Sequence, residues 1–544
     1  MPLLSGVMRA HTARVLVAAS VAGVACMAAI TVACGEGCRS TSGVQPNPPT
    51  TDSSAPSLRL YVVSDVAGAL EPCGCVKDQL GGLDHVAAWM ASERKSAPNA
   101  LLVGSGPLFF LDAKLEADKK EQDLAKAETL AVSLKGLGLA AFSPGQNDLA
   151  GGRDLLTRLG QQAGAPALAA NADGFDRATV RDIGGLKVGF VGVSGLEGAA
   201  RPPADAVKEA SQALRQQGAK IVIALASVGR GEAKRIADAV PDLTAIVVGS
   251  PSSSGDANTT APMPERIGNV IVAEASNHLQ TVAVLDLFVK GGSYSFADGT
   301  GLEKGIKREA LTRRITELRG KIATWEKEGK VDKKDIDARK ADLARLEVER
   351  DDLDKQAPPQ KGSFFRYTVK EIRDSLGSSP DTHAQLLAYY KKVNDRNKEL
   401  FKDRKPRDVS KGEAKYIGVD ACTSCHEEPR KVWDKTSHAH AYATLTKEFK
   451  EFNLDCVSCH VTGYDKPGGS TVTHVKELES VQCETCHGPG SAHAKAPEKV
   501  KTPVSKPGDA LCEQCHHPPH VHEFDAKAKM KEILGPGHGI KSAP

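Results

Sequence analysis

Four copies of one short motif of cysteine and histidine lie in the last quarter of the 544-residue chain. In each copy two cysteines are separated by two residues, and a histidine follows the second cysteine directly. Two thiols on one turn can reach the two vinyl groups of a porphyrin, which places the adjacent imidazole under the iron. The sequence therefore predicts four c-type haems, attached at Cys422, Cys425, Cys456, Cys459, Cys483, Cys486, Cys512 and Cys515, with proximal ligands His426, His460, His487 and His516.

Structural zinc is the alternative, because paired cysteines also build tetrahedral zinc sites. Zinc does not need a histidine directly after every second cysteine, and here all four pairs have one. A disulfide framework is disfavoured as well, since the chain has 13 cysteines but none between Cys75 and Cys422. Haem is the interpretation that accounts for the cysteines and the histidines together.

Other histidines of the same region could supply the second axial ligands. Twelve of the chain's 16 histidines lie between residues 426 and 538, whereas this region has a single methionine, Met530. We therefore expect that most of the haems have two histidine ligands. Such haems have lower reduction potentials than haems with one histidine and one methionine ligand. Eight histidines of this region remain after the four proximal ligands, which is more than the number of irons, so some of the eight must be surface residues. The eight candidates are His438, His440, His474, His493, His517, His520, His522 and His538.

Five segments of this region carry a family resemblance: residues 416–422, Trp433 with residues 437–442, residues 459–464, residues 483–493, and His538. With these segments, residues 416–539 resemble the tetrahaem cytochrome c-554 family, whose members carry electrons. In that family three haems have two histidine ligands and one lacks a protein sixth ligand. The resemblance implies that His438, His493 and His538 are distal ligands and that His460, in the second motif, belongs to the open haem. It leaves open which distal histidine serves which iron.

An open iron allows two hypotheses for the function. We favour simple relay of electrons through all four haems, which makes the chain an electron-transfer protein and not an enzyme. The alternative is a reductase that binds a small nitrogen oxide such as nitric oxide at the open haem.

The N-terminal part alternates short β-rich runs with amphipathic stretches, which predicts an α/β layered domain over residues 58–300 plus 360–375. We expect strands at residues 58–63, 100–103, 187–193, 220–226, 243–248, 269–273, 281–289 and 363–372. We expect helices at residues 83–95, 121–134, 153–162, 204–216 and 231–240.

Several turns of this domain resemble the calcineurin-like metallophosphoesterases of the 5′-nucleotidase branch, with most metal ligands missing. Asp65 stands at a ligand position of that family, and residues 145–148, Gly-Gln-Asn-Asp, stand at its Gly-Asn-His position. A two-metal site needs Asp, His and Asn ligands around both ions, but other ligand positions carry Ala67, Pro107, Ser227, Ser250 and Ser252. We therefore expect no dinuclear hydrolysis. The alternative is a metal-dependent, 5′-nucleotidase-like phosphohydrolase linked to the redox domain.

Cys73 and Cys75 form a separate C-x-C pair in this domain. They could bind a metal, with His85 as a third ligand, form a disulfide, or be redox active. A purely structural turn is the simpler alternative.

Between the two regions, residues 303–357 predict a charged helical hairpin. Leu311, Ile315, Leu318, Ile322 and Trp325 repeat at heptad spacing, and a similar stripe resumes after a break at residues 329–332. A spacer is the favoured role, and a docking surface is the alternative. Residues 380–412 predict a helix and a linker, and residues 413–544 predict a mainly helical and irregular multihaem domain.

The N-terminus predicts export. Arg9 and Arg14 precede an apolar run at residues 15–33, as in a secretory signal. Residues 31–35 resemble a bacterial lipobox with lipidation at Cys34, although that motif usually has leucine where Thr31 stands. We predict a signal peptide of lipoprotein type at residues 1–34 and a flexible tether at residues 35–57, with a plain signal peptide or an uncleaved membrane helix as alternatives.

Location and partners follow from these features. We expect a periplasmic or outer-membrane protein that is anchored to the membrane by lipid and exchanges electrons with redox proteins. The formal net charge is only +3, which gives no nucleic-acid signature.

Overall fold

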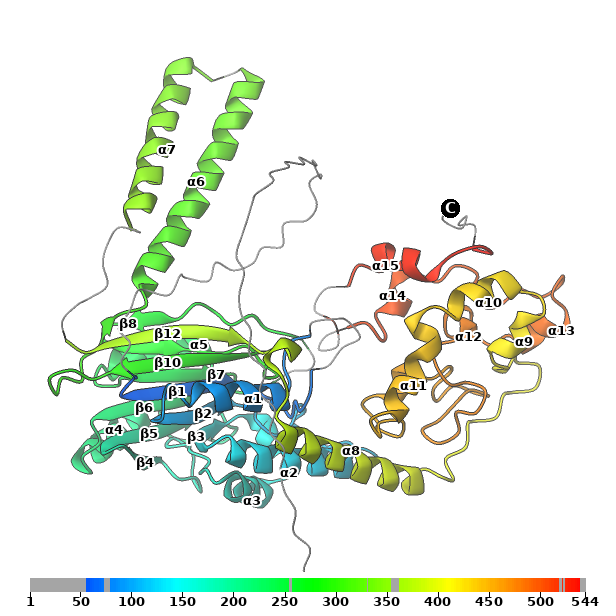
Figure 1. Ribbon diagram of the computed structural model, residues 1–544, viewed down its shortest axis with the longest axis horizontal. Helices are drawn as coiled ribbons and strands as arrows, with labels where there is room; N and C mark the ends of the chain where they lie inside the picture. The colour runs from blue at the N-terminus through cyan, green and yellow to red at the C-terminus, as the bar shows by residue number, and fades with distance from the viewer. Residues whose placement is uncertain are drawn as a thin grey trace, which may run out of the picture. The chain divides into compact units, whose positions relative to one another are not determined.

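The computed structural model describes residues 55–72, 79–253, 257–329, 331–353, 362–517, 521 and 524–538 (Figure 1). All of them belong to one compact unit, Pro48–Pro544. The predicted signal peptide, the lipidation site Cys34 and most of the tether lie outside the described residues, as do Cys73 and Cys75.

Two six-stranded sheets form the middle of the N-terminal domain (Figure 1). The first has the order β11-β12-β10-β1-β2-β3. Strands β1, β2 and β3 run parallel, and β10 runs antiparallel to both β1 and β12. The bounds are β1 (Leu58–Ser64), β2 (Ala100–Gly106), β3 (Leu139–Pro144), β10 (Thr281–Phe288), β11 (Ala297–Asp298) and β12 (Phe364–Glu371).

The second sheet has the order β4-β5-β6-β7-β9-β8. Its inner strands β5, β6, β7 and β9 are parallel, and the edge strands β4 and β8 are antiparallel to their neighbours. Parallel strands are buried on both faces, which explains continuous apolar runs such as Ile-Val-Ile-Ala-Leu-Ala in β6. The bounds are β4 (Ala178–Ile183), β5 (Leu186–Ser194), β6 (Ile221–Ser227), β7 (Ala245–Gly249), β8 (Glu265–Ile267) and β9 (Val270–Ala273).

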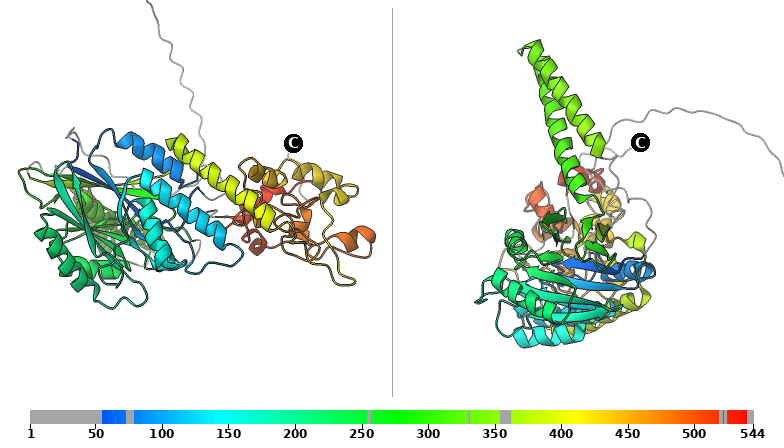
Figure 2. Two further views of the ribbon diagram at one scale, coloured as in Figure 1. Left: turned by 90° about the horizontal axis from the view of Figure 1, so that it is seen from below. Right: turned by 90° about the vertical axis from the view of Figure 1, so that its left-hand side faces the viewer.

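Three apolar clusters hold four layers together. One lies between the two sheets and joins Leu60 to Phe190 and Val247. The second packs the outer face of the first sheet against α1 (Leu83–Glu93), α2 (Lys120–Gly136), α3 (Arg153–Ala163) and α8 (Pro380–Leu400). The third packs the second sheet against α4 (Pro203–Gln216) and α5 (Arg230–Ala239). Figure 2 shows the helices on the outer sides of the strands.

The predicted strands and helices of this domain are confirmed, with ends that differ by at most three residues. Strand β12 returns to the domain after the hairpin, as predicted, and pairs along its whole length with β10. Strands β4, β8 and β11 were not predicted, and neither was β3. Its sequence, Leu-Ala-Ala-Phe-Ser-Pro, has few β-branched residues, and its burial comes from neighbours on both faces.

The hairpin consists of α6 (Leu302–Glu328) and α7 (Lys333–Leu353), which project from the domain (Figure 1). The predicted apolar seam is confirmed, because Leu311 and Ile315 pack against Leu346 and Leu353.

Helix α8 begins at a Ser379 cap, whose hydroxyl accepts from the backbone N–H of Thr382. The first part of its buried face is apolar and packs on α1 and α2 through residues such as Leu386. The last part carries the buried amides Asn394 and Asn397. Figure 2 shows the helix extending from the α/β domain toward the C-terminal region.

The C-terminal region has short helices and long connections. Its apolar cluster is small, with Tyr442, Val457, Val461 and Val475 as the buried members. The expected multidomain fold class, an α/β layered domain followed by a helical hairpin and a mainly helical or irregular region, is confirmed. No helix of the described residues is both long and apolar enough to cross a membrane. The longer elements are α9 (Val419–Thr423), α10 (Glu427–Trp433), α11 (Ala441–Thr446), α12 (Cys483–His487), α13 (Ser491–Lys495), α14 (Asp509–Cys512) and α15 (Ala526–Ile533).

Candidate haem-binding site

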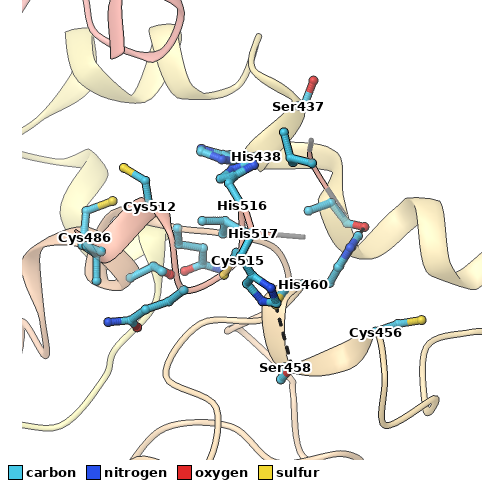
Figure 3. Close-up of a pocket in the computed structure, with 18 of the residues that line it drawn as sticks. Ser437, His438, Cys456, Ser458, His460, Cys486, Cys512, Cys515, His516 and His517 are labelled. Atoms are coloured by element: carbon cyan, nitrogen blue, oxygen red, sulfur yellow. Dashed lines mark hydrogen bonds between the residues drawn. The ribbon is translucent and has the colours of Figure 1, made fainter. Parts of the chain in front are cut away.

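All four cysteine–histidine motifs, which we number first to fourth in chain order, line one cavity. Figure 3 shows residues of the second, third and fourth motifs in it. Its volume is about 2910 Å³. Pockets for single cofactors commonly measure about 300–1,000 Å³, so this one has room for several. Both cysteines and the histidine of every motif are among the lining residues, and the eight cysteines are free of disulfide bonds.

A single helical turn positions each motif. In the first, the backbone N–H groups of Cys425 and His426 both donate to the carbonyl oxygen of Cys422, at 3.2 and 3.0 Å. The fourth motif repeats this arrangement, with Cys515 and His516 donating to Cys512 at 3.1 and 2.9 Å. The turn brings two thiols and one imidazole to the same place, as attachment to one porphyrin requires.

Three motif histidines face a second histidine. The ring centroids are 6.2 Å apart for His426 and His493, 6.1 Å for His516 and His438, and 6.3 Å for His487 and His538. A bond between a metal and an imidazole nitrogen measures about 2 Å, so two imidazoles on opposite sides of one metal have centroids roughly 6 Å apart. The spacing of the three pairs therefore fits an iron between the rings.

Backbone carbonyl groups orient several of these rings. Nδ1 of His487 lies 2.8 Å from the carbonyl oxygen of Val504, and Nδ1 of His493 lies 2.6 Å from that of Val500. Only an N–H can donate to a carbonyl, so the proton sits on Nδ1 and Nε2 keeps its lone pair for a metal. Burial also lowers the pKa of His438 and His460, which favours the neutral imidazole that binds iron.

His460, in the second motif, is different. Its Nδ1 lies 2.6 Å from the carbonyl oxygen of Ala441, so its Nε2 is also available. The three ring pairs at that spacing among the described residues do not include His460. His517 lies near Cys459 of the same motif. His440 lies 3.1 Å from the carbonyl oxygen of Asp434, and His474 lies beside Thr473. His520 and His522 are outside the described residues.

The motifs do not follow one another in space as they do in the chain. The thiol of Cys483, in the third motif, lies close to that of Cys422 in the first and raises the pKa of Cys422. Burial raises the pKa of Cys486, also in the third motif, to about 11, and neighbouring Cys512 of the fourth adds to the shift.

The last link joins the fourth motif to the second. A hydrogen bond with Cys515 lowers the pKa of Cys459 to about 6. The motifs are therefore neighbours in the order first, third, fourth, second.

The α/β domain holds the second motif through Asp455, the residue before Cys456. Lys119, at the N-cap of α2, and Lys126 each place their Nζ 2.5 Å from a carboxylate oxygen of Asp455. Burial alone would raise the pKa of Asp455, but Lys126 and Lys119 outweigh it and hold that pKa well below its usual range. This carboxylate therefore stays ionised at the contact between the two regions, where it is partly buried.

Buried amides complete the same contact. Nε2 of Gln122 donates to Asn453 at 3.1 Å and to Asp455 at 3.2 Å, and its Oε1 accepts from the backbone N–H of Leu454 at 3.0 Å. Asn397 of α8 donates to the same Oε1 and to the carbonyl oxygen of Phe452, both at 2.9 Å.

A cation adds to this contact, with Lys450 placing its Nζ 2.5 Å from Glu71 and 4.3 Å from the ring centroid of Tyr390. Sequence reasoning did not find this contact. Its only local signal is the presence of amides, Gln122, Asn394 and Asn397, on otherwise apolar helix faces.

The phosphoesterase-like positions of the α/β domain are occupied by internal hydrogen bonds. Asp65, with a positive φ of 46°, accepts from the backbone N–H and the hydroxyl of Ser250, both at 2.8 Å. Ser227 accepts from the N–H of Gly106 at 2.6 Å and donates to the carbonyl of Ser143 at 2.6 Å. A Cβ added at Gly106 would lie 1.7 Å from Asp65, so these loops approach very closely.

Asp148 lies beside these residues and is fully buried. Its carboxylate accepts from the backbone N–H groups of Leu108, Phe109 and Gly145 at 2.8–3.2 Å. Burial raises the pKa of Asp148 to about 7 and that of Asp65 to about 6.

In the described part of the chain, no three histidine, cysteine, aspartate or glutamate side chains lie close enough together to hold a metal ion. Nδ1 of His85 lies 2.6 Å from the carbonyl oxygen of Gly377. A metal or redox role of Cys73 and Cys75 stays a prediction, because both residues lie outside the described ranges.

The C-terminal region is similar to known haem proteins. Residues 421–488 match the family described as cytochrome c554 and c-prime, and this match contains the first three motifs. Cytochrome c-554 of Nitrosomonas europaea is 37% identical over 94 residues, which cover 14% of this chain and 40% of that protein. The chain thus spans about two fifths of the length of this curated relative. The resemblance inferred from the sequence is confirmed, and because of it residues 413–544 are called the cytochrome region below.

The α/β domain is similar in fold to phosphoesterases. A 5′-nucleotidase precursor from Thermus thermophilus is 16% identical with a TM-score of 0.42, covering 62% of this chain and 59% of that one. The calcineurin-like phosphoesterase YfkN from Bacillus subtilis is 19% identical with a TM-score of 0.36, covering 43% and 86%. These similarities agree with the resemblance that the sequence predicts for this domain.

Proposed function

We propose that this chain is an exported electron-transfer protein that carries four covalently attached c-type haems and whose α/β domain does not hydrolyse phosphoesters. The observation that carries the proposal is the set of four cysteine–histidine turns around one cavity, three of which face a second imidazole at about 6 Å. A haem supplies a centre that gains and loses one electron.

The residues of this chain would set the properties of those centres. The eight cysteines of the motifs would anchor the porphyrins, and the pairs His426–His493, His516–His438 and His487–His538 would hold the irons. Ligation by two neutral imidazoles lowers the reduction potential relative to ligation by histidine and methionine. The neighbour order of the motifs gives electrons a continuous route from the first motif to the second.

Two features support the absence of phosphoester hydrolysis. Asp65, a carboxylate at a ligand position, already accepts two hydrogen bonds from Ser250. Pro107 and Ser227 stand where a dinuclear site needs metal-binding side chains, and Ser227 is bonded to the backbone on both sides. Purified protein with added manganese should not hydrolyse nucleotides. Hydrolysis that disappears in Asp65→Ala would overturn this part of the proposal and favour the redox-linked phosphohydrolase.

A second function is favoured by His460 alone. Because the three ring pairs of the described residues do not include it, an iron bound there could take a small nitrogen oxide such as nitric oxide. Turnover of nitric oxide that tracks a high-spin haem signal would favour this reductase over a simple relay.

Location and partners belong to the same proposal. A lipid on Cys34 would anchor the chain in the periplasm or at the outer membrane, where redox proteins would deliver and accept electrons. Cys34→Ser should release the mature protein from the membrane fraction, and labelled fatty acid should no longer be incorporated. Retention of Cys34→Ser in the membrane would instead support an uncleaved helix.

The decisive experiment is a pyridine haemochrome titration of protein expressed with a c-haem maturation system. Four haems per chain are expected. A value near zero, with zinc bound in their place, would make the cysteine–histidine motifs structural zinc sites and overturn the proposal.

A further inference from the structure

The second motif stands at the end of the motif order and is also where the α/β domain holds the cytochrome region. Residues 452–455 lead directly into Cys456, and side chains of α2 and α8 bind this segment. By contrast, Gln482, the residue before the third motif, contacts its own region, where it accepts from Val419 at 2.7 Å and donates to Glu479 at 2.9 Å. The α/β domain therefore contacts the residue before the second motif, whereas the residue before the third motif contacts its own region.

The contact with residues 452–455 is specific in its geometry. The N–H and C=O of Phe452, the N–H of Leu454 and the side chains of Asn453 and Asp455 all bond to α2 or α8. The amide of Gln122 uses both its nitrogen and its oxygen for this purpose. Buried amides that are fully paired fix one arrangement of the groups that they join, since any other arrangement leaves a polar group unpaired.

The contact is also charged. Lys119 and Lys126 face Asp455, and Asp123 lies 4.0 Å from Lys119. Tyr389 of α8 contributes a buried hydroxyl that has no hydrogen-bond partner among the described residues. Lys119, Lys126, Asp123 and Tyr389 line the cavity together with Cys456 and His460. The side chains of Lys119, Lys126 and Asp455 are partly buried, and water screens partly buried charges less than exposed ones, so each acts on a redox centre nearby.

We propose that α2 of the α/β domain is a clamp that positions the haem of the second motif and sets its reduction potential, through Lys119, Lys126 and Asp455. These are positioning residues, because they act through the peptide that carries Cys456 and through their charges. The inference rests on the proposed function in one respect, namely that a haem is attached at Cys456 and Cys459. It gives the α/β domain a role that requires no hydrolysis.

The clamp makes a prediction about sign. An oxidised haem carries one more positive charge than a reduced haem, so a nearby positive charge favours reduction. Lys126→Met removes a positive charge and should lower the midpoint potential of one haem. Asp455→Asn removes a negative charge and should raise the midpoint potential of the same haem. A loss of structure would not produce shifts of opposite sign.

The experiment is a spectroelectrochemical titration of the full-length haem-loaded chain, with the high-spin and low-spin haems followed separately by electron paramagnetic resonance. We expect the high-spin component to shift in opposite directions in the two variants while the other midpoints stay in place. Lys126→Arg should restore the wild-type value. Lys119→Met, at a more exposed lysine, should give a smaller downward shift if Lys126→Met does not fold.

Arg404→Gln is the matched control. Arg404 also joins the two regions, with ion pairs to Asp118 at 3.0 Å and Asp465 at 2.9 Å, but it does not bind residues 452–455. Its removal should leave all midpoints unchanged.

Shifts of equal sign in Lys126→Met and Asp455→Asn, or no shift in either variant while the wild-type protein holds four haems, would overturn the clamp alone. A wild-type chain without haem would overturn the proposed function and the clamp together.

Discussion

The α/β domain and the cytochrome region bury very different amounts of apolar surface in their own cores. The α/β domain has three large apolar clusters, whose members include fully buried Tyr61, Phe142 and Phe190. The cytochrome region has one small cluster around Val457 and Val461. The first region can fold from its own side chains, whereas the second needs a further apolar group at its centre.

The two regions also differ in how their polar groups are satisfied. At the phosphoesterase-like positions, Asp65 and Ser227 are bonded to neighbours within the domain. In the cytochrome region, motif thiols and imidazole nitrogens point into a cavity and toward one another. A site that is closed by its own hydrogen bonds suits a scaffold, and a site that leaves its strongest ligands available suits a cofactor.

The largest expected effect follows from withholding haem during expression. The cytochrome region should then lose its structure, while the α/β domain should remain folded, because only the former lacks an apolar core. Limited proteolysis with mass spectrometry should show cleavage concentrated after residue 413 and a protected N-terminal fragment. Equal protection of both regions without haem would remove the contrast between them.

A large effect of the opposite kind is expected from Phe190→Ala, which opens a cavity between the two sheets. Loss of a buried phenylalanine costs about 3–5 kcal/mol of unfolding free energy. Denaturant unfolding followed by circular dichroism should show this loss, with an unchanged haem spectrum under native conditions. Val348→Ala is a suitable control, because Val348 on α7 is 60% exposed and a surface change costs within about 0.5 kcal/mol.

A moderate effect is expected from pH. Burial raises the pKa of Asp148 to about 7 and that of Asp65 to about 6, so the folded domain binds more protons than the unfolded chain between about pH 4 and 7. The unfolding free energy of the α/β domain should therefore be highest below pH 4 and fall as the pH rises through this window.

Asp455 should behave in the opposite way. Its pKa is lowered in the folded protein, so its contribution is present above its unfolded value and is lost on acidification. For the carboxylates of the α/β domain, the test is Asp65→Asn. Between pH 4, 5.5 and 7 its unfolding free energy should fall less steeply with rising pH than that of the wild-type protein. If the unfolding free energy of the α/β domain rose with pH instead, the raised pKa values of Asp65 and Asp148 would be contradicted.

The smallest effect on the fold, with a clear spectroscopic signature, is expected from His493→Ala. It removes the imidazole that faces His426 and should convert one low-spin haem to high-spin. His474→Ala should leave the spin state unchanged, since Nδ1 of His474 lies 3.1 Å from the hydroxyl oxygen of Thr473 and His474 faces no motif histidine among the described ring pairs. An unchanged spectrum in His493→Ala would exclude His493 as an axial ligand.

Much of the α/β domain could be predicted from its sequence. Apolar periodicity located its long strands and helices, and the return of β12 after the hairpin followed from a β-rich run at residues 363–372. These features depend on neighbours in the chain. Strand β3 was missed because its small residues are buried only by contacts with both sheets and with helices.

The cytochrome region was predictable in a different sense. The local sequence of each motif predicts haem attachment. The partner of each histidine depends on loops that bring distant residues together, such as His426 with His493 and His438 with His516. The contact of Asp455 with Lys119 and Lys126 has the same character, because it joins positions more than 300 residues apart. Such pairings leave no periodic pattern in the chain.

The neighbour order of the motifs has a consequence for biosynthesis. The fourth motif is the last to leave the ribosome, yet it lies between the third and the second in space. A chain that stopped before Cys512 would hold three of the four motifs and would lack the link that joins two of them to the remaining one. Under the proposed function, the route from the first motif to the second would be complete only when the final segment of the polypeptide has been made, and truncated products would not conduct electrons between the two ends of that route.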